Sequence, residues 1–260
     1  MRPLGEQTVL VTGSTDGLGR AVAAELAGRG ADVLVHGRDP AKAEAVAAEI
    51  GAARFVVADL SSLEEVRRLA AETGEADTLV NNAGVAVLER RESTDGHELT
   101  FAVNYLSHFL LTGLLLENSL REPARIVNVA SIGQAPIDFD DPMLERSYDR
   151  SRAYSQSKLA QISHAFELAE RLGERDVTVN ALHPATLMDT KLVRETYGAA
   201  RTTIEEGMTA TVRLAADPDL DAVTGRYFDG LAEARAHAQA YDPDARRRLW
   251  ELSERLVAAA

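Results

Sequence analysis

The 260-residue chain contains no cysteine, which excludes disulfide bonds and thiolate metal sites. Lysine is nearly absent as well: among 28 basic residues only Lys42, Lys158 and Lys191 are lysines, as a coding bias towards arginine and alanine would produce. The 41 acidic residues leave a net charge of −13. Such a balance argues against nucleic acid or an anionic membrane as the main partner.

Long hydrophobic runs are also missing. We find no apolar run that approaches the roughly 20 residues of a membrane span, and residues 1–6 lack the apolar core of a signal peptide. Repeats and low-complexity linkers do not occur either. We therefore expect a cytoplasmic protein that folds as a single domain over residues 1–260.

Short apolar runs alternate with helix-forming segments. The runs predict strands at residues 8–12, 32–36, 54–58, 77–80, 125–130 and 177–182, with a weaker one at 225–228. Residues 20–30, 41–50 and 61–71 predict helices, with Ser61 or Ser62 as the N-cap of the third, and the chain from Leu231 onwards predicts helix and turn. This alternation predicts an α/β fold, with a parallel sheet covered on both faces.

A glycine-rich turn, Thr12-Gly-Ser-Thr-Asp-Gly-Leu-Gly-Arg20, lies between the first predicted strand and helix. Glycines at such a turn permit positive φ and let the backbone approach a ligand closely. The following helix N-terminus presents free N–H groups to a phosphate. An ordinary βα turn is the alternative, but the strand-turn-helix context favours a phosphate-bearing ligand.

The spacing G-x-x-x-G-x-G after a threonine resembles the short-chain dehydrogenase/reductase family. Three more motifs of that family follow in order: Asn81-Asn82-Ala83-Gly84, Ser131, and Tyr154-Ser-Gln-Ser-Lys158. Residues 101–109 and the long segment between Ser131 and Tyr154 resemble the retinol-dehydrogenase-like branch. The resemblance, from about residue 8 to 228, implies a Rossmann-type, doubly wound, mostly seven-stranded parallel sheet. It also implies an oxidoreductase that interconverts a carbonyl and an alcohol with NAD(P)(H).

Tyr154 and Lys158 are spaced i, i+4, which places both on one face of a helix. A free phenol has a pKa of about 10, and a neighbouring ammonium lowers it, so the pair can act as a general acid/base. A solvent-facing Tyr-Lys pair is the alternative. The resemblance implies that Ser131 holds the substrate oxygen. It also implies that Asn104 kinks its helix and binds a water that joins Lys158 to solvent.

The end of the second predicted strand bears on the choice of nucleotide. NAD enzymes place an acidic residue there, whereas this chain reads His36-Gly37-Arg38. A guanidinium can form paired hydrogen bonds to a 2′-phosphate, so NADP(H) is favoured. The alternatives are a solvated Arg38 and a preference weakened by Asp39.

The resemblance implies further cofactor contacts. They lie in the glycine turn, at the adenine and ribose positions, in the Tyr-Lys pair and in the segment after the sixth predicted strand. The residues are Gly13, Ser14, Thr15, Gly17, Leu18, Gly19, Arg38, Asp59, Leu60, Asn81, Ala83, Gly84, Tyr154, Lys158, Pro184, Leu187 and Thr190. Asn82 is expected to be structural, and Asp59 could instead cap a helix. Ala185 departs from the family's Pro-Gly pattern, and Thr186 competes with Thr190 for its role.

Other features point away from chemistry. The six histidines lack metal-ligand spacing, so no metal site is expected, and acidic residues 138–149 predict a solvated loop. His108 is expected to be a packed or interfacial residue. The leucine-rich helix of residues 110–116 predicts, by resemblance, a homodimer or homotetramer.

Residues from about 187 to 208 match the variable region that closes over the substrate, with Tyr197 and Met208 as possible lining residues. The branch implies a small, hydrophobic carbonyl or alcohol as substrate. Two other functions stay open: an NAD-dependent alcohol dehydrogenase, and a non-catalytic NADP(H)-sensing module.

Overall fold

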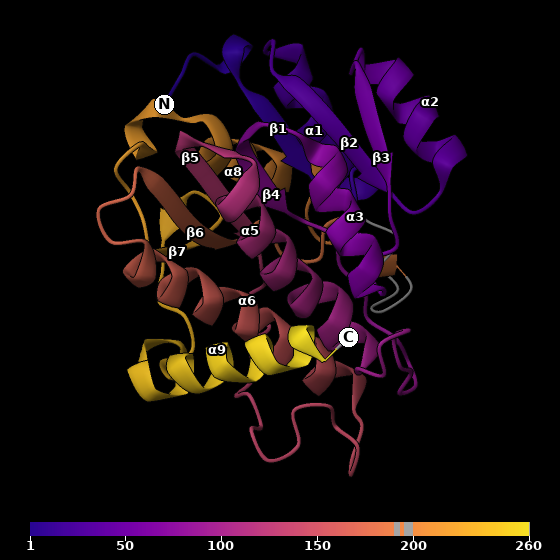
Figure 1. Ribbon diagram of the computed structural model, residues 1–260, viewed down its shortest axis with the longest axis vertical. Helices are drawn as coiled ribbons and strands as arrows, with labels where there is room; N and C mark the ends of the chain where they lie inside the picture. The colour runs from indigo at the N-terminus through magenta and orange to yellow at the C-terminus, as the bar shows by residue number, and fades with distance from the viewer. Residues whose placement is uncertain (190–192, 195–199, 260) are drawn as a thin grey trace.

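The computed structural model describes residues 1–189, 193–194 and 200–259. Its centre is an eight-stranded sheet in the order β3-β2-β1-β4-β5-β6-β7-β8 (Figure 1). The strands are β1 (Thr8–Val11), β2 (Asp32–Gly37), β3 (Arg54–Val57), β4 (Ala76–Asn81), β5 (Leu120–Val129), β6 (Val177–His183), β7 (Tyr227–Asp229) and β8 (Ala232–Glu233). All neighbouring pairs are parallel except β7 and β8.

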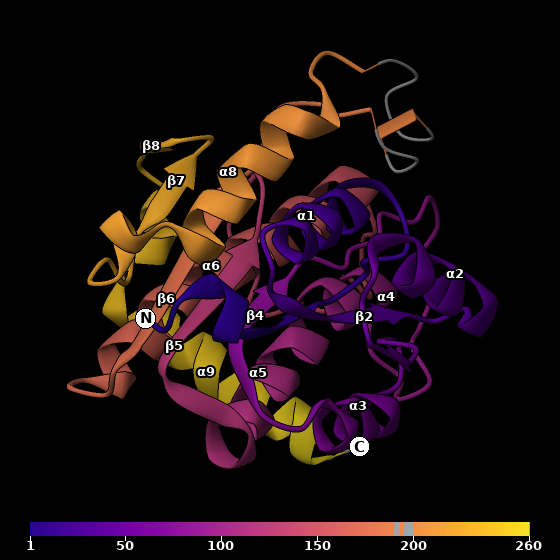
Figure 2. The same ribbon diagram turned by 90° about the horizontal axis from the view of Figure 1, so that it is seen from above.

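Helices cover both faces of the sheet, as Figure 2 shows from above. One face carries α1 (Gly17–Gly28), α2 (Pro40–Ile50) and α8 (Ile204–Ala216) over one hydrophobic core. The other carries α3 (Leu63–Thr73), α5 (Ser107–Asn118), α6 (Arg150–Leu172) and α9 (Pro243–Ala258) over a second core. Shorter helical turns are η1 (Leu4–Glu6), α4 (Leu99–Phe101), the π-helix η2 (Ala102–Leu106), η3 (Pro218–Leu220) and η4 (Ala238–Tyr241).

The predicted parallel α/β architecture is confirmed, and each of the seven expected strands is present within a few residues. Ser62 caps α3 through a bond from the Glu65 N–H. The prediction that residues from 231 onwards form only helix and turn was wrong. Residues 232–233 form β8, which pairs with the sheet edge after the positive-φ turn at Gly230. A two-residue strand carries too little periodicity to be recognised in a sequence.

The continuous helical stretch Leu99–Asn118, formed by α4, η2 and α5, corrects the expectation that no segment is long and apolar enough to cross a membrane. By length and composition it would qualify, yet 78% of its most apolar window is buried inside the fold. A core helix of a globular domain has the same properties. Leu111 and Leu115 are fully covered within the chain, whereas Leu114 and Leu116 are only partly buried, and the homo-oligomer stays a prediction.

Helix α9 lies across α6 and packs against η2 (Figure 1). The buried Arg246 pairs with Glu167 and Glu170 of α6. The ring of Trp250 packs edge-on against Phe109, with centroids 5.0 Å apart. The chain's own C-terminal helix thus supports the elements that carry Asn104 and Tyr154.

Candidate active site

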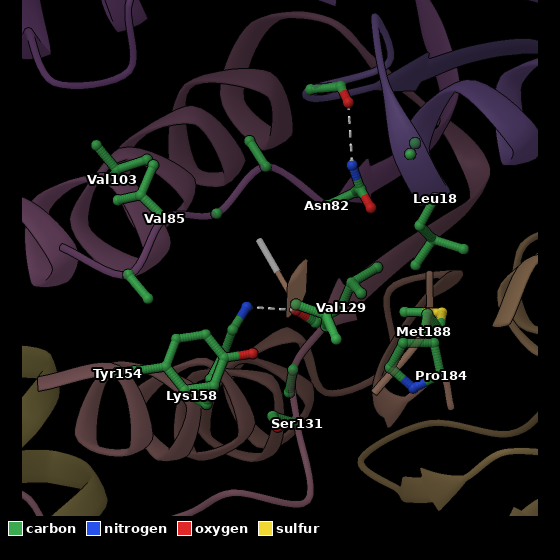
Figure 3. A pocket seen from close by; sticks show the side chains of 18 of the residues that line it. Leu18, Asn82, Val85, Val103, Val129, Ser131, Tyr154, Lys158, Pro184 and Met188 are labelled. Carbon is green, nitrogen blue, oxygen red and sulfur yellow. Dashed lines mark hydrogen bonds between the residues drawn. The ribbon is translucent and has the colours of Figure 1, made fainter. Parts of the chain in front are cut away.

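A cleft of about 640 Å³ opens at the carboxyl ends of the parallel strands. In open α/β sheets this edge is where ligands bind, because the loops there diverge at the change in strand order. The glycine turn after β1 and the loop after β2 form one part of the wall; Tyr154 and Lys158 of α6, with Ser131, form another (Figure 3). The volume is within the range of small-molecule and cofactor pockets.

The glycine turn is held in place by the strands beside it. Gly13 has a φ of 65°, and a Cβ on Gly19 would come within 2.3 Å of the Gly13 carbonyl oxygen. The Gly13 N–H donates to His36 Nδ1 (3.0 Å), and burial lowers the pKa of His36 to about 4, which keeps this acceptor neutral. Asn82 Nδ2 donates to the Thr12 and Gly13 carbonyls. The turn therefore has a fixed backbone with room for a ligand beside it.

Arg38 follows β2, lines the cleft and is exposed. The carboxylate of Asp39 accepts the Ala41 and Lys42 N–H groups as the N-cap of α2. Asp39 is therefore committed to capping, while Arg38 is the basic side chain at the end of β2.

Tyr154 and Lys158 lie on the same face of α6 and line the cleft (Figure 3). Lys158 Nζ is 5.6 Å from the Tyr154 ring centroid and donates to the Val129 carbonyl (2.8 Å). Burial lowers the pKa of Lys158 to about 7. The Ser131 hydroxyl accepts the Gly133 N–H (3.0 Å), which leaves its own proton to donate. A phenol, an ammonium and a hydroxyl donor thus meet in one cleft.

Asn104 lies in the π-helix η2, so the helix is locally irregular where the resemblance implied a kink. Its side chain bonds to both backbone groups of Val85 and donates to Ser157 Oγ of α6 (2.9 Å). A Cβ on Gly84 would come within 3.3 Å of Asn104 Oδ1 and 3.6 Å of Lys158 Nζ. Gly84 thus allows the two side chains to approach each other.

The structure brings most of the expected site residues together. The cleft is lined by Gly13, Thr15, Gly17, Leu18, Gly19, Arg38, Asp59, Leu60, Ala83, Gly84, Ser131, Tyr154, Lys158, Pro184 and Leu187. Asp59 both lines the cleft and accepts the Ser61 N–H. Thr186 lines it too, at hydrogen-bonding distance from His183 (3.0 Å).

Other expected residues lie elsewhere. Asn81 is buried in the sheet and donates to Asn128 and Thr112, because its position in β4 directs the amide into the core. Ser14 is buried against the His36 backbone, and Asn104 lies behind the cleft wall. The physical reason is shared: the Asn81 Nδ2, the Ser14 hydroxyl and the Asn104 amide all make internal hydrogen bonds.

Part of the variable region lies outside the described residues. That part includes Thr190 and Tyr197. Residues 204–208, expected in the substrate loop, form the first turn of α8, where Met208 packs on the core, while Met188 lines the cleft.

Sequence reasoning missed several cleft residues. Val85, Val103 and Ile132 supply apolar wall, and Arg150 lies one helical turn before Tyr154. The i, i+4 spacing of Arg150 and Tyr154 is the signal that could have found the arginine.

The residues that line this cleft fit a dinucleotide. A Cβ on Gly37 would come within 2.4 Å of the Thr15 side chain, and one on Gly19 would meet the backbone of the turn. Because both positions are glycine, no Cβ is present there, and the backbone packs closely beside the space that the phosphate and ribose would occupy. Arg38 and Asp59 follow β2 and β3 at one side of the sheet, and Lys158 contacts Val129 of β5 further along, so the cleft extends across the strand ends as a dinucleotide would require. Among the described residues no group of three or more His, Asp or Glu side chains could hold a metal ion.

Comparison with known proteins agrees with this geometry. The family model for short chain dehydrogenases matches residues 7–201. Human retinol dehydrogenase 13 is 39% identical over 96% of this chain and 84% of its own length. A crystal structure of an uncharacterised protein from Mycobacterium paratuberculosis has a TM-score of 0.83 and 32% identity, over 97% of this chain and 94% of that one. A short chain dehydrogenase from Burkholderia cenocepacia in complex with NADP has a TM-score of 0.70 and 26% identity, over 88% and 97%. The chain belongs to the short-chain dehydrogenase/reductase family, in its retinol-dehydrogenase-like branch, and is an oxidoreductase that acts on CH–OH groups.

Proposed function

We propose that the protein is an NADP(H)-dependent oxidoreductase that interconverts a small apolar carbonyl and its alcohol, with Tyr154 as general acid/base. The observation that carries the proposal is the meeting of Tyr154, Lys158 and Ser131 in the cleft that begins at the glycine turn. A bound nicotinamide would supply or accept the hydride.

The protein's own part is to position the substrate and move a proton. The Ser131 hydroxyl donates to the substrate oxygen and holds it against Tyr154. In reduction, Tyr154 Oη gives its proton to the oxygen as negative charge develops there; in oxidation it removes that proton. The Lys158 ammonium stabilises the resulting phenolate through its positive charge, an effect strengthened because the ammonium is buried.

Arg38 supports NADP(H) as the nucleotide. It is the basic side chain at the end of β2, and the only nearby carboxylate expected to weaken the preference, that of Asp39, caps α2. The Burkholderia relative's complex with NADP is consistent with this choice.

The substrate side of the cleft supports an apolar substrate. Val85, Val103, Ile132 and Val193 line it. Several relatives are named retinol dehydrogenases, so retinol and other apolar alcohols and aldehydes are the first compounds to test.

Replacing Tyr154 with Phe tests the proposal. The variant lacks the transferable proton but keeps the ring, so we expect kcat to fall by about 10²- to 10⁴-fold with little change in nucleotide affinity. The measurement is NADPH absorbance against a panel of apolar aldehydes and ketones, and NADP⁺ reduction against the alcohols. Tight NADPH binding by the native protein with no turnover across the panel would instead support the nucleotide-sensing module.

A further inference from the structure

Lys158 is an ammonium in an unusual environment. Its side chain is 4% exposed, and among the described residues it makes no ion pair that would balance its charge. Its Nζ has two neutral acceptors, the Val129 carbonyl and Gln161 Oε1, each at 2.8 Å. A buried ammonium without a carboxylate depends on such acceptors to stay protonated.

Gln161 is the side-chain acceptor of the two and is 1% exposed. It lies three residues after Lys158 on α6, so both side chains share a helix face. An ammonium has only donors, so the amide must turn its oxygen towards Nζ and its Nε2 away. Nε2 then faces His108 Nδ1 at 3.4 Å.

His108 continues this contact to the glycine turn. Burial lowers the pKa of His108 to about 3, so the ring is neutral. A carbonyl oxygen only accepts, so the neutral ring carries its proton on Nδ1 and donates it to the Asn104 carbonyl (3.0 Å), while its Nε2 accepts from Thr12 Oγ1 (3.1 Å). Thr12 Oγ1 in turn accepts the N–H groups of Asn82 and Ala83. Buried polar side chains therefore lie in contact from Lys158 to the strand end where the glycine turn begins.

We propose that Gln161 is the positioning residue of Lys158: its amide oxygen holds the ammonium protonated and directed at Tyr154. The consequence for turnover rests on the proposed function, whereas the effect on the protonation of Lys158 does not.

The scarcity of lysine makes the test direct. Protein labelled with ¹³C-lysine contains only Lys42, Lys158 and Lys191, and the signal absent from a Lys158→Met variant identifies Lys158. The measurement is the titration midpoint of that signal. Gln161→Leu removes the acceptor at similar volume, and we expect the Lys158 midpoint to fall by about one pH unit. Gln161→Glu supplies an oxygen with negative charge and raises the midpoint above that of the native protein.

Gln156→Leu is the matched control. Gln156 is also a buried glutamine of α6, but it bonds to Asp138 and Pro142 of the preceding loop and not to Lys158. We expect the titration midpoint of Lys158 in Gln156→Leu to match that in the native protein. An unchanged midpoint in Gln161→Leu, or an equal shift in Gln156→Leu, overturns the proposal.

Kinetics supply the second readout. In carbonyl reduction, kcat/KM is measured as a function of pH. The alkaline limb of this profile should shift to lower pH in Gln161→Leu and shift back to higher pH in Gln161→Glu. A merely structural role would lower activity at every pH without moving that limb. If the native protein has no nucleotide-dependent turnover, the proposed function fails, and the lysine titration still decides the role of Gln161.

Discussion

Arg38 illustrates how a single side chain can decide between two nucleotides that differ by one phosphate. It is exposed at the rim of the cleft, so it meets a ligand without first losing a partner inside the protein. Its proposed contact with a 2′-phosphate would be a charge-assisted hydrogen bond in a chain whose net charge of −13 otherwise repels polyanions.

Arg38→Ala should weaken NADPH binding by about 10- to 100-fold, the range of one charge-assisted contact, and leave NADH binding nearly unchanged. The measurement is the dissociation constant of each nucleotide, from the fluorescence of the reduced form. Arg20→Ala is a suitable control, because that arginine is paired with Glu49 on the outer side of α1. An unchanged NADPH/NADH ratio in Arg38→Ala would rule out the phosphate contact.

At the scale of elements, α1 and its preceding turn form one rigid unit. Asp16 caps the helix by accepting the Gly17 N–H. Asn82, from the Asn-Asn-Ala-Gly motif, donates its side-chain N–H to the Thr12 carbonyl and so holds the turn in place. Two of the glycines in α1, Gly19 and Gly28, have opposite surroundings. Gly19 faces backbone, whereas nothing lies within 4 Å of a Cβ on Gly28.

Gly19→Ala should therefore abolish measurable nucleotide binding, because its Cβ would overlap the Gly13 carbonyl and Asn82 Nδ2 and force the turn apart. Gly28→Ala, in the same helix, should bind nucleotide as the native protein does and be as stable or up to about 1 kcal/mol more stable. Calorimetric titration with NADPH and thermal melting compare them. Equal affinities for the two variants would contradict the assigned geometry.

For the whole molecule, buried neutral histidines set the response to acid. Burial lowers the pKa of His36 and His164 to about 4 and that of His108 to about 3. The unfolded chain binds protons at these positions from pH 6.5 downwards, while the folded protein does not. The free energy of unfolding therefore falls as the pH drops from about 6.5 to about 4.

We expect the melting temperature to decrease steadily over that pH interval, with each histidine contributing on the order of 1 kcal/mol. His164→Phe tests one contribution. The ring of His164 packs among Tyr105, Phe109 and Trp250, an environment that suits an uncharged aromatic ring. The melting temperature of the variant should decrease less than that of the native protein between pH 7 and pH 5. An equally steep decrease in melting temperature would refute this account.

Much of the fold and site could be predicted from sequence because the signals are local. Strand-helix alternation predicts the parallel sheet, and the i, i+4 spacing of Tyr154 and Lys158 places both on one helix face. The burial of the Asn81 and Ser14 side chains away from the cleft could not be predicted, because a motif gives neighbours in sequence and only the packing of the sheet decides which side chain points into the core. The short strand β8 and the packing of α3 on the leucine-rich helix α5 depend on contacts between distant segments.

The sequence by itself determined the fold class, the order of the family motifs and the three residues proposed to carry the chemistry. Lysine is scarce in the sequence, yet one of the three lysines, Lys158, lies where the proposed chemistry needs an ammonium. Gln161 is only three residues from Lys158, but the other acceptor and the surroundings of that ammonium are decided by the tertiary structure: Val129 lies 29 residues before Lys158, and the nearby His108–Thr12 contact joins residues 96 apart. Hydrogen bonds over such separations exist only after α5, α6, β1 and β5 have packed together, so no local pattern encodes them.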